Sequence, residues 1–250
     1  MGQYLEGKDI KTFIAVFLVA FVASVPLNFL LIFTHEGGHG LLILPAIILN
    51  RGLPETPSQE EGSTRAAELK GNPFTKFPPA VILFFLCFPL GVASDAFLSY
   101  LSLKAMKKLN VATLTGTVTR AILLSLSILA LSSALENLLA GADFSFIWEA
   151  VGFPYEAPWL RTMLTVVSFV GFPGLLVIKG TVPLPEAAGA ATGAFAGTWI
   201  FLTFMMEHVY PILMANFWWL FVVGTPVFIL VAAALLKMAK ANARQGEITA

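Results

Sequence analysis

Two histidines and a glutamate stand at a spacing that is typical of zinc chemistry. They are His35, Glu36 and His39, the fixed positions of an HExxH motif in a chain with only three histidines. On a helix, side chains at i and i+4 lie on one face, so both imidazoles can bind the same metal ion. Glu36 is then placed to act as general base on a zinc-bound water. The motif therefore predicts a catalytic zinc site.

A catalytic zinc ion usually takes three protein ligands and a water, so a distant segment must complete this site. Ionisable groups inside membrane segments are costly and are candidates for function. Two polar clusters, Glu207-His208 and Glu136-Asn137, are predicted at the depth of the motif. His208 is our first choice for the third ligand. Glu136 is its rival, as a ligand or as a partner that orients a ligand imidazole, and Asn137 could donate to an oxyanion.

The composition predicts an integral membrane protein. The chain has 250 residues, of which 57% are hydrophobic and 12% charged, and its formal net charge is zero. Soluble domains are usually about one-quarter charged, so this chain falls in the membrane class. The balanced charge gives no basic field for nucleic-acid binding. Cys87 is the only cysteine, which excludes an internal disulfide.

We expect an all-α polytopic protein with about six transmembrane helices and a single membrane domain over residues 1–250. The first segment holds the motif and is too long for one perpendicular crossing, so it crosses either once, tilted and extended, or twice. Lysine positions favour six passes with both termini cytoplasmic, and we expect the plasma membrane. Residues 50–78 form a polar loop, either solvated or a lid. The apolar segments are 11–49, 79–103, 111–140, 160–181, 186–212 and 215–238.

Glycines in the fifth segment predict which helices approach closely. Gly189, Gly193 and Gly197 form a small-xxx-small ladder, a pattern that allows close helix packing in membranes. His208 follows on the same face, about three turns later. The ladder could therefore draw this segment against the first and bring His208 to the metal.

Two further pairs of residues carry weaker predictions. Gly37 and Gly38, inside the motif, leave space either for an extended peptide or for a neighbouring helix, and the sequence does not separate these readings. Asp95 and Arg120 are expected at similar depth on consecutive antiparallel passes. Because unpaired charges there would be expensive, we predict that they form a buried ion pair.

The HEGGH sequence in a hydrophobic helix resembles the membrane-embedded zinc metalloproteases, especially the site-2 protease family. The resemblance covers residues 35–39 and the apolar setting. It implies that His35 and His39 bind zinc and that Glu36 is the base of a protease cutting peptide or membrane-protein substrates in or near the bilayer. That family usually takes its third ligand from an Asp-Gly pair, and this sequence has no such dipeptide. Its site also commonly faces the cytosol, whereas here the motif is predicted toward the outside.

Two other functions remain open from the sequence. In a divalent-metal transporter, His35, Glu36, His39 and His208 would line the transport path. In a non-catalytic membrane subunit, the HExxH pattern would be fortuitous. Membrane lipids are expected partners in every case.

Overall fold

A computed structural model describes residues 7–49, 79–107, 109, 113–209, 212 and 217–248. Every regular element in this part of the chain is helical, as the composition predicts. The long helices are α1 (Gly7–Leu49), α3 (Pro79–Met106), α4 (Leu114–Leu139), α8 (Leu184–Phe204) and α10 (Phe217–Ile248). The shorter elements are η1 (Ala142–Phe144), α5 (Ser145–Val151), α6 (Pro158–Val166), the π-helical η2 (Val167–Gly171), α7 (Phe172–Ile178) and the π-helical η3 (Met205–Val209). The predicted polar loop at 50–78 lies outside the described residues.

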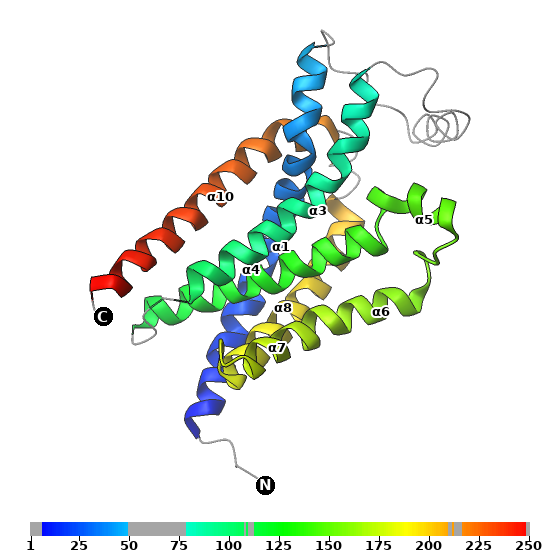
Figure 1. Cartoon of the computed structure of the whole chain (residues 1–250). Coiled ribbons are helices and arrows are strands. Elements are labelled where there is room, and N and C mark those ends of the chain that lie inside the picture. The colour runs from blue at the N-terminus through cyan, green and yellow to red at the C-terminus, as the bar shows by residue number, and fades with distance from the viewer. Residues whose placement is uncertain are drawn as a thin grey trace.

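Helix α1 is the central element of the bundle (Figure 1). It is one continuous helix of 43 residues, despite Pro26 and Pro45. This settles the question that the sequence left open, because a pair of crossings joined by a tight turn would break the helix. Helices α3, α4, α8 and α10 all pack against it, so residues on different faces of α1 meet different partners.

The glycine ladder does bring α8 against α1, as its spacing predicts. A Cβ atom on Gly189 would lie 2.7 Å from the carbonyl oxygen of Phe13, and one on Gly193 would collide with the carbonyl oxygen of Phe17. Such contacts leave no room for any larger side chain. Side-chain hydrogen bonding reinforces this seam, since Asn28 Nδ2 donates to Thr198 Oγ1 at 2.9 Å.

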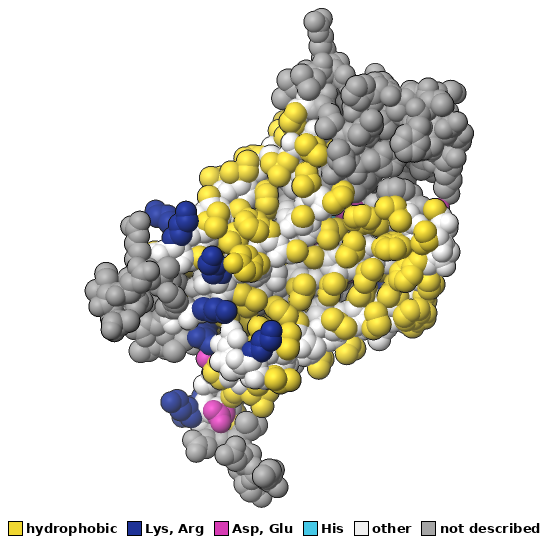
Figure 2. Space-filling model, viewed as in Figure 1, with side chains coloured by type: hydrophobic (Ala, Val, Ile, Leu, Met, Phe, Trp, Pro, Cys, Tyr) yellow, Lys and Arg dark blue, Asp and Glu magenta, His cyan; other side chains and the backbone are white. Residues whose placement is uncertain are grey.

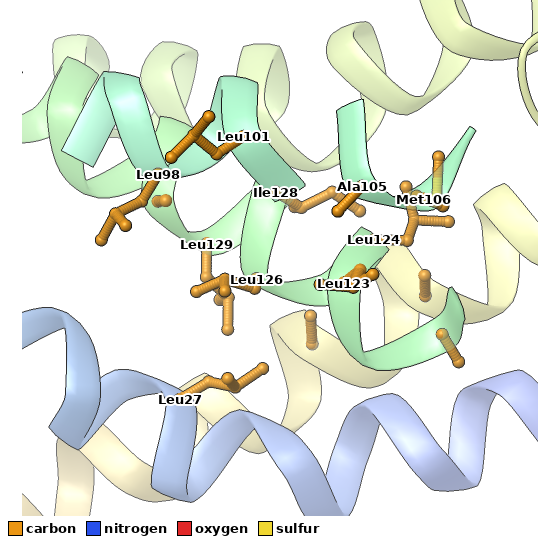
Figure 3. Close-up of a cluster of buried hydrophobic side chains, with 14 of the residues drawn as sticks. Leu27, Leu98, Leu101, Ala105, Met106, Leu123, Leu124, Leu126, Ile128 and Leu129 are labelled. Carbon is orange, nitrogen blue, oxygen red and sulfur yellow. The ribbon is translucent and has the colours of Figure 1, made fainter. Parts of the chain in front are cut away.

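Helices α3 and α4 pack antiparallel beside α1 and enclose the main apolar core. Leu98 and Leu101 of α3 face Leu124 and Ile128 of α4, with Leu27 of α1 nearby (Figure 3). The register of the pair is fixed by Ser99 and Ser127. The Ser99 hydroxyl donates to the Ser127 carbonyl at 2.9 Å, and the Ser127 hydroxyl donates to the Ser99 carbonyl at 3.1 Å.

This register contradicts the predicted ion pair between Asp95 and Arg120. Counted from the paired serines, the two residues lie on opposite sides along the helix axis. They are separated by about eleven residues, or roughly 16 Å of helix rise. Arg120 instead donates from Nε to Glu186 Oε2 at 2.7 Å, which ties α4 to the first turn of α8.

The bundle has the dimensions and surface of a membrane protein. Five stretches of the described chain are long and apolar enough to cross a membrane, namely Gly7–Pro45, Leu114–Leu139, Pro158–Ile178, Leu184–Val209 and Trp219–Ala241. Helix α3, with 28 residues, corresponds to the remaining predicted segment at 79–103. Hydrophobic side chains are spread over the middle of the face shown in Figure 2, and many large ones are exposed. These features agree with the predicted polytopic all-α architecture.

Charge divides the two ends of the bundle. The start of α1, the α3–α4 connection, the α7–α8 connection and the end of α10 lie at one end (Figure 1). Lys and Arg side chains gather at this end on the face shown in Figure 2. The opposite end carries η1, α5 and the part of α1 that holds the HExxH motif.

Candidate metal centre

Three potential ligand atoms from two separate elements converge at the end of the bundle opposite the lysines. His35 and His39 lie one turn apart on α1, and their Nε2 atoms are 3.2 Å apart. Asp143 of η1 brings Oδ2 to 3.0 Å from the Nε2 of His35 and 3.4 Å from that of His39. Both histidines are buried, and the Asp143 side chain is only 17% exposed. The three side chains could hold a metal ion between them.

Asp143 reaches this position because the chain turns tightly after α4. A Cβ atom on Gly141 would meet the backbone of Asn137, so the turn depends on glycine for close approach. The indole of Trp148 donates to the carbonyl oxygen of Leu138 at 2.7 Å, which fastens α5 to the last turn of α4. Phe153 packs on the Trp148 ring with the centroids 4.9 Å apart. The loop that carries Asp143 is therefore held at both of its ends.

The electrostatics favour an ionised carboxylate at this point. Burial alone would raise the pKa of Asp143, but hydrogen bonds from His35 and His39 and their positive charge outweigh that effect. The pKa of Asp143 is consequently held well below its usual range. Asp143 thus presents an anionic oxygen to the two imidazoles.

The other nitrogen of His35 is held by a second carboxylate. Nδ1 of His35 lies 2.9 Å from Oδ2 of Asp95, a fully buried residue of α3. The same oxygen accepts a hydrogen bond of 2.6 Å from the hydroxyl of Ser133 on α4. Because a carboxylate can only accept, Nδ1 of His35 must carry the hydrogen in this contact. With Nδ1 fixed as a donor, loss of the Nε2 hydrogen that bonds to Asp143 would leave a lone pair on Nε2, the atom that faces His39 and Asp143.

Glu36 lies beside the cluster. It is half-buried, and the charges of His35, His39 and Asp143 all act on it. Its position in the motif and this proximity would suit a group that exchanges a proton with a water molecule bound next to the histidines.

Neighbouring helices occupy the space beside the glycines of the motif. A Cβ on Gly37 would strike the backbone of Gly224 on α10, and one on Gly38 would strike the Leu90 carbonyl and Ser94 on α3. This arrangement supports the interpretation that Gly37 and Gly38 allow neighbouring helices to approach. It leaves no space for an extended peptide at those two positions. Gly91 of α3 lies against the imidazoles themselves, since a Cβ there would collide with Nε2 of His39.

The structure does not bring the two expected third ligands to the histidine pair. His208 lies in η3 with its side chain 59% exposed, stacks on Phe204 with the centroids 5.0 Å apart, and has the neighbouring Glu207 at 3.8 Å. Glu136 is exposed on α4. Neither belongs to the group that could hold a metal ion. The glycine ladder packs α8 against α1 as expected, but His208 lies in η3 beyond the end of α8 and its side chain is exposed.

Asn137 makes a contact that the sequence did not predict. Its Nδ2 donates to the Ser133 hydroxyl at 3.3 Å. That contact makes Asn137 part of the hydrogen-bonded chain behind His35.

Sequence reasoning missed Asp143 and Gly91, and it paired Asp95 with Arg120 rather than with His35 and Ser133. Asp143 had a usable signal, because it follows the predicted third segment by only a few residues, at the same end as the motif. Asp143 stands outside the predicted membrane segments, where a charged group has no cost that would mark it as functional. The roles of Asp95 and Ser133 depend on the register of α3 and α4, which the sequence does not reveal.

Comparison with protein-family models, with curated proteins and with solved structures finds no match for this chain.

Proposed function

We propose that this protein is a zinc-dependent membrane protease that hydrolyses peptide bonds in or near the bilayer. The observation that carries the proposal is the convergence of His35, His39 and Asp143 beside Glu36. Two histidines and one carboxylate are a common ligand set of catalytic zinc, which leaves a fourth position for water or substrate.

The spacing of the three ligand atoms supports zinc as the metal. Zinc binds nitrogen and carboxylate oxygen at about 2.0–2.2 Å in tetrahedral geometry, which separates neighbouring ligand atoms by roughly 3.3–3.6 Å. The separations here are 3.0, 3.2 and 3.4 Å. A shift of a few tenths of an ångström would therefore bring the three atoms to the spacing that zinc requires.

Each residue has a defined part in the proposed reaction. His35, His39 and Asp143 hold the metal, which when bound supplies a Lewis acid that polarises a carbonyl and acidifies water. Glu36 accepts the proton of the attacking water and returns it to the leaving amine. Asp143 follows the end of the α4 span at Leu139 by only a few residues, so the site lies near an interface, where water has a short path.

Replacing Glu36 with Gln tests the proposal. Wild type and the E36Q variant are expressed in cells, and new peptide N-termini in the membrane fraction are compared by mass spectrometry. We expect zinc to remain bound in E36Q while the products seen with wild type disappear. Glu136→Gln, at an exposed carboxylate of α4, is the matched control and should leave the products unchanged.

Two results would contradict the proposal. One is equal product formation by wild type and E36Q. The other is uptake of zinc into vesicles that contain wild type, without any proteolytic product, which would indicate transport instead.

A further inference from the structure

Behind His35, a chain of hydrogen bonds links three helices through the buried carboxylate of Asp95 and ends at Asn137. Asn137 donates to Ser133, Ser133 donates to Asp95, and Asp95 also accepts from His35. Asn137 and Ser133 lie one turn apart on α4, and the next turn leads to Gly141 and the loop of Asp143. The hydrogen-bonded chain therefore links His35 on α1 to the last turns of α4, directly before the loop that carries Asp143.

Burial of Asp95 at this place is unfavourable for the stability of the bundle. The residue is fully buried, and within the described chain its Oδ1 atom has no hydrogen-bond partner. Arg120, the cation that the sequence predicted as its partner, pairs with Glu186 instead. A buried carboxylate with one unsatisfied oxygen destabilises a membrane bundle. Packing therefore does not account for Asp95, and among the residues that the structure describes His35 is its hydrogen-bond partner outside α3 and α4.

We infer that Asp95 is a positioning residue for the metal, acting through His35. This inference rests on the proposed metal site. The carboxylate keeps the hydrogen of His35 on Nδ1, orients the ring, and makes Nε2 a stronger donor to a cation. Ser133 fixes the oxygen that receives the imidazole hydrogen, so it contributes to the same alignment.

The inference is tested on purified protein in detergent by competition between the protein and a chelator for zinc. Removing a carboxylate behind a ligand histidine typically weakens metal binding by about 10- to 100-fold. We expect a loss of this size in Asp95→Asn. Ser133→Ala removes the hydrogen bonds of Ser133 with Asp95 and Asn137, and loss of the one to Asp95 should weaken zinc binding by roughly two- to tenfold.

The chain offers a matched control for these variants. Ser127 is a buried serine that, like Ser133, bonds across the α3–α4 contact, but its partner is Ser99. Ser127→Ala should therefore lower thermal stability without changing zinc affinity. Cobalt(II) gives a second readout, because its visible absorption reports ligand geometry. The cobalt spectrum should shift in Asp95→Asn and Ser133→Ala, and should stay unchanged in Ser127→Ala.

The outcomes separate this inference from the proposed function. Wild-type zinc affinity and an unchanged cobalt spectrum in folded Asp95→Asn would overturn the role of Asp95 alone. An equal loss of affinity in Ser127→Ala and Ser133→Ala would also overturn it, since the effect would then be general loosening of α3 and α4. If wild type itself bound no zinc, the proposed metal site would fail as well.

Discussion

The close packing of the candidate metal centre depends on single atoms. Gly91 of α3 has no side chain, and that absence is what lets the ring of His39 lie where it does. In a tightly packed interior, even one added carbon forces side chains away from their positions. The ligand geometry is therefore sensitive to residues that carry no chemistry of their own.

Gly91→Ala is expected to impair metal binding. The added methyl group would collide with Nε2 of His39, so the imidazole must rotate away from Asp143 and His35. We expect zinc affinity to fall by at least tenfold in a chelator competition, with the helical circular dichroism retained. Ala93→Val adds bulk on an exposed position of the same helix and should bind zinc as wild type does. Unchanged affinity in Gly91→Ala would show that the imidazoles are not confined by α3.

Helix packing around α1 gives His35 and His39 fixed neighbours. The α1–α8 seam depends on glycines whose Cβ positions are occupied by the backbone of α1, whereas Gly174 of α7 faces open space. The two kinds of helical glycine should therefore respond in opposite ways to the same substitution.

Gly193→Ala should destabilise the bundle, because its Cβ would collide with the carbonyl oxygen of Phe17. Overpacking of this kind typically costs about 1–3 kcal/mol. Gly174→Ala should leave the unfolding temperature unchanged or raise it, since alanine favours helix more than glycine does. Thermal unfolding in detergent measures both. Equal behaviour of the two variants would mean that the α1–α8 seam is looser than the contacts indicate.

The elements were predictable from the sequence to different degrees. Runs of apolar residues predicted the long helices, and glycine spacing predicted the contact of α8 with α1, because both depend on local periodicity. The partner of Asp95 depends on the register between α3 and α4, which is fixed by the paired hydroxyls of Ser99 and Ser127. The position of Asp143 depends on a turn after α4, where no periodic signal operates. These long-range relations are the part that the sequence could not supply.

At the scale of the whole molecule, charge and topology agree. The basic end of the bundle carries the start of α1 and the end of α10, and the candidate metal centre lies at the other end. The positive-inside rule predicts that the basic end is cytoplasmic and that the candidate metal centre faces outward. The plasma membrane and this orientation remain predictions.

Accessibility of single cysteines tests the orientation. In a Cys87→Ser background, cysteine is introduced at Lys107, Lys179 or Glu149, and intact cells are treated with a membrane-impermeant maleimide. We expect labelling at position 149 only, because Lys107 and Lys179 lie at the basic end. Labelling at 107 and 179 without labelling at 149 would reverse the topology and place the metal centre toward the cytosol.

The most direct test of the whole account is the zinc content of purified protein, measured by mass spectrometry for wild type, Asp143→Ala and His208→Ala. The account predicts equimolar zinc in wild type and in His208→Ala, and its loss in Asp143→Ala. Full zinc in Asp143→Ala, together with its loss in His208→Ala, would contradict the ligand set on which the proposed function depends.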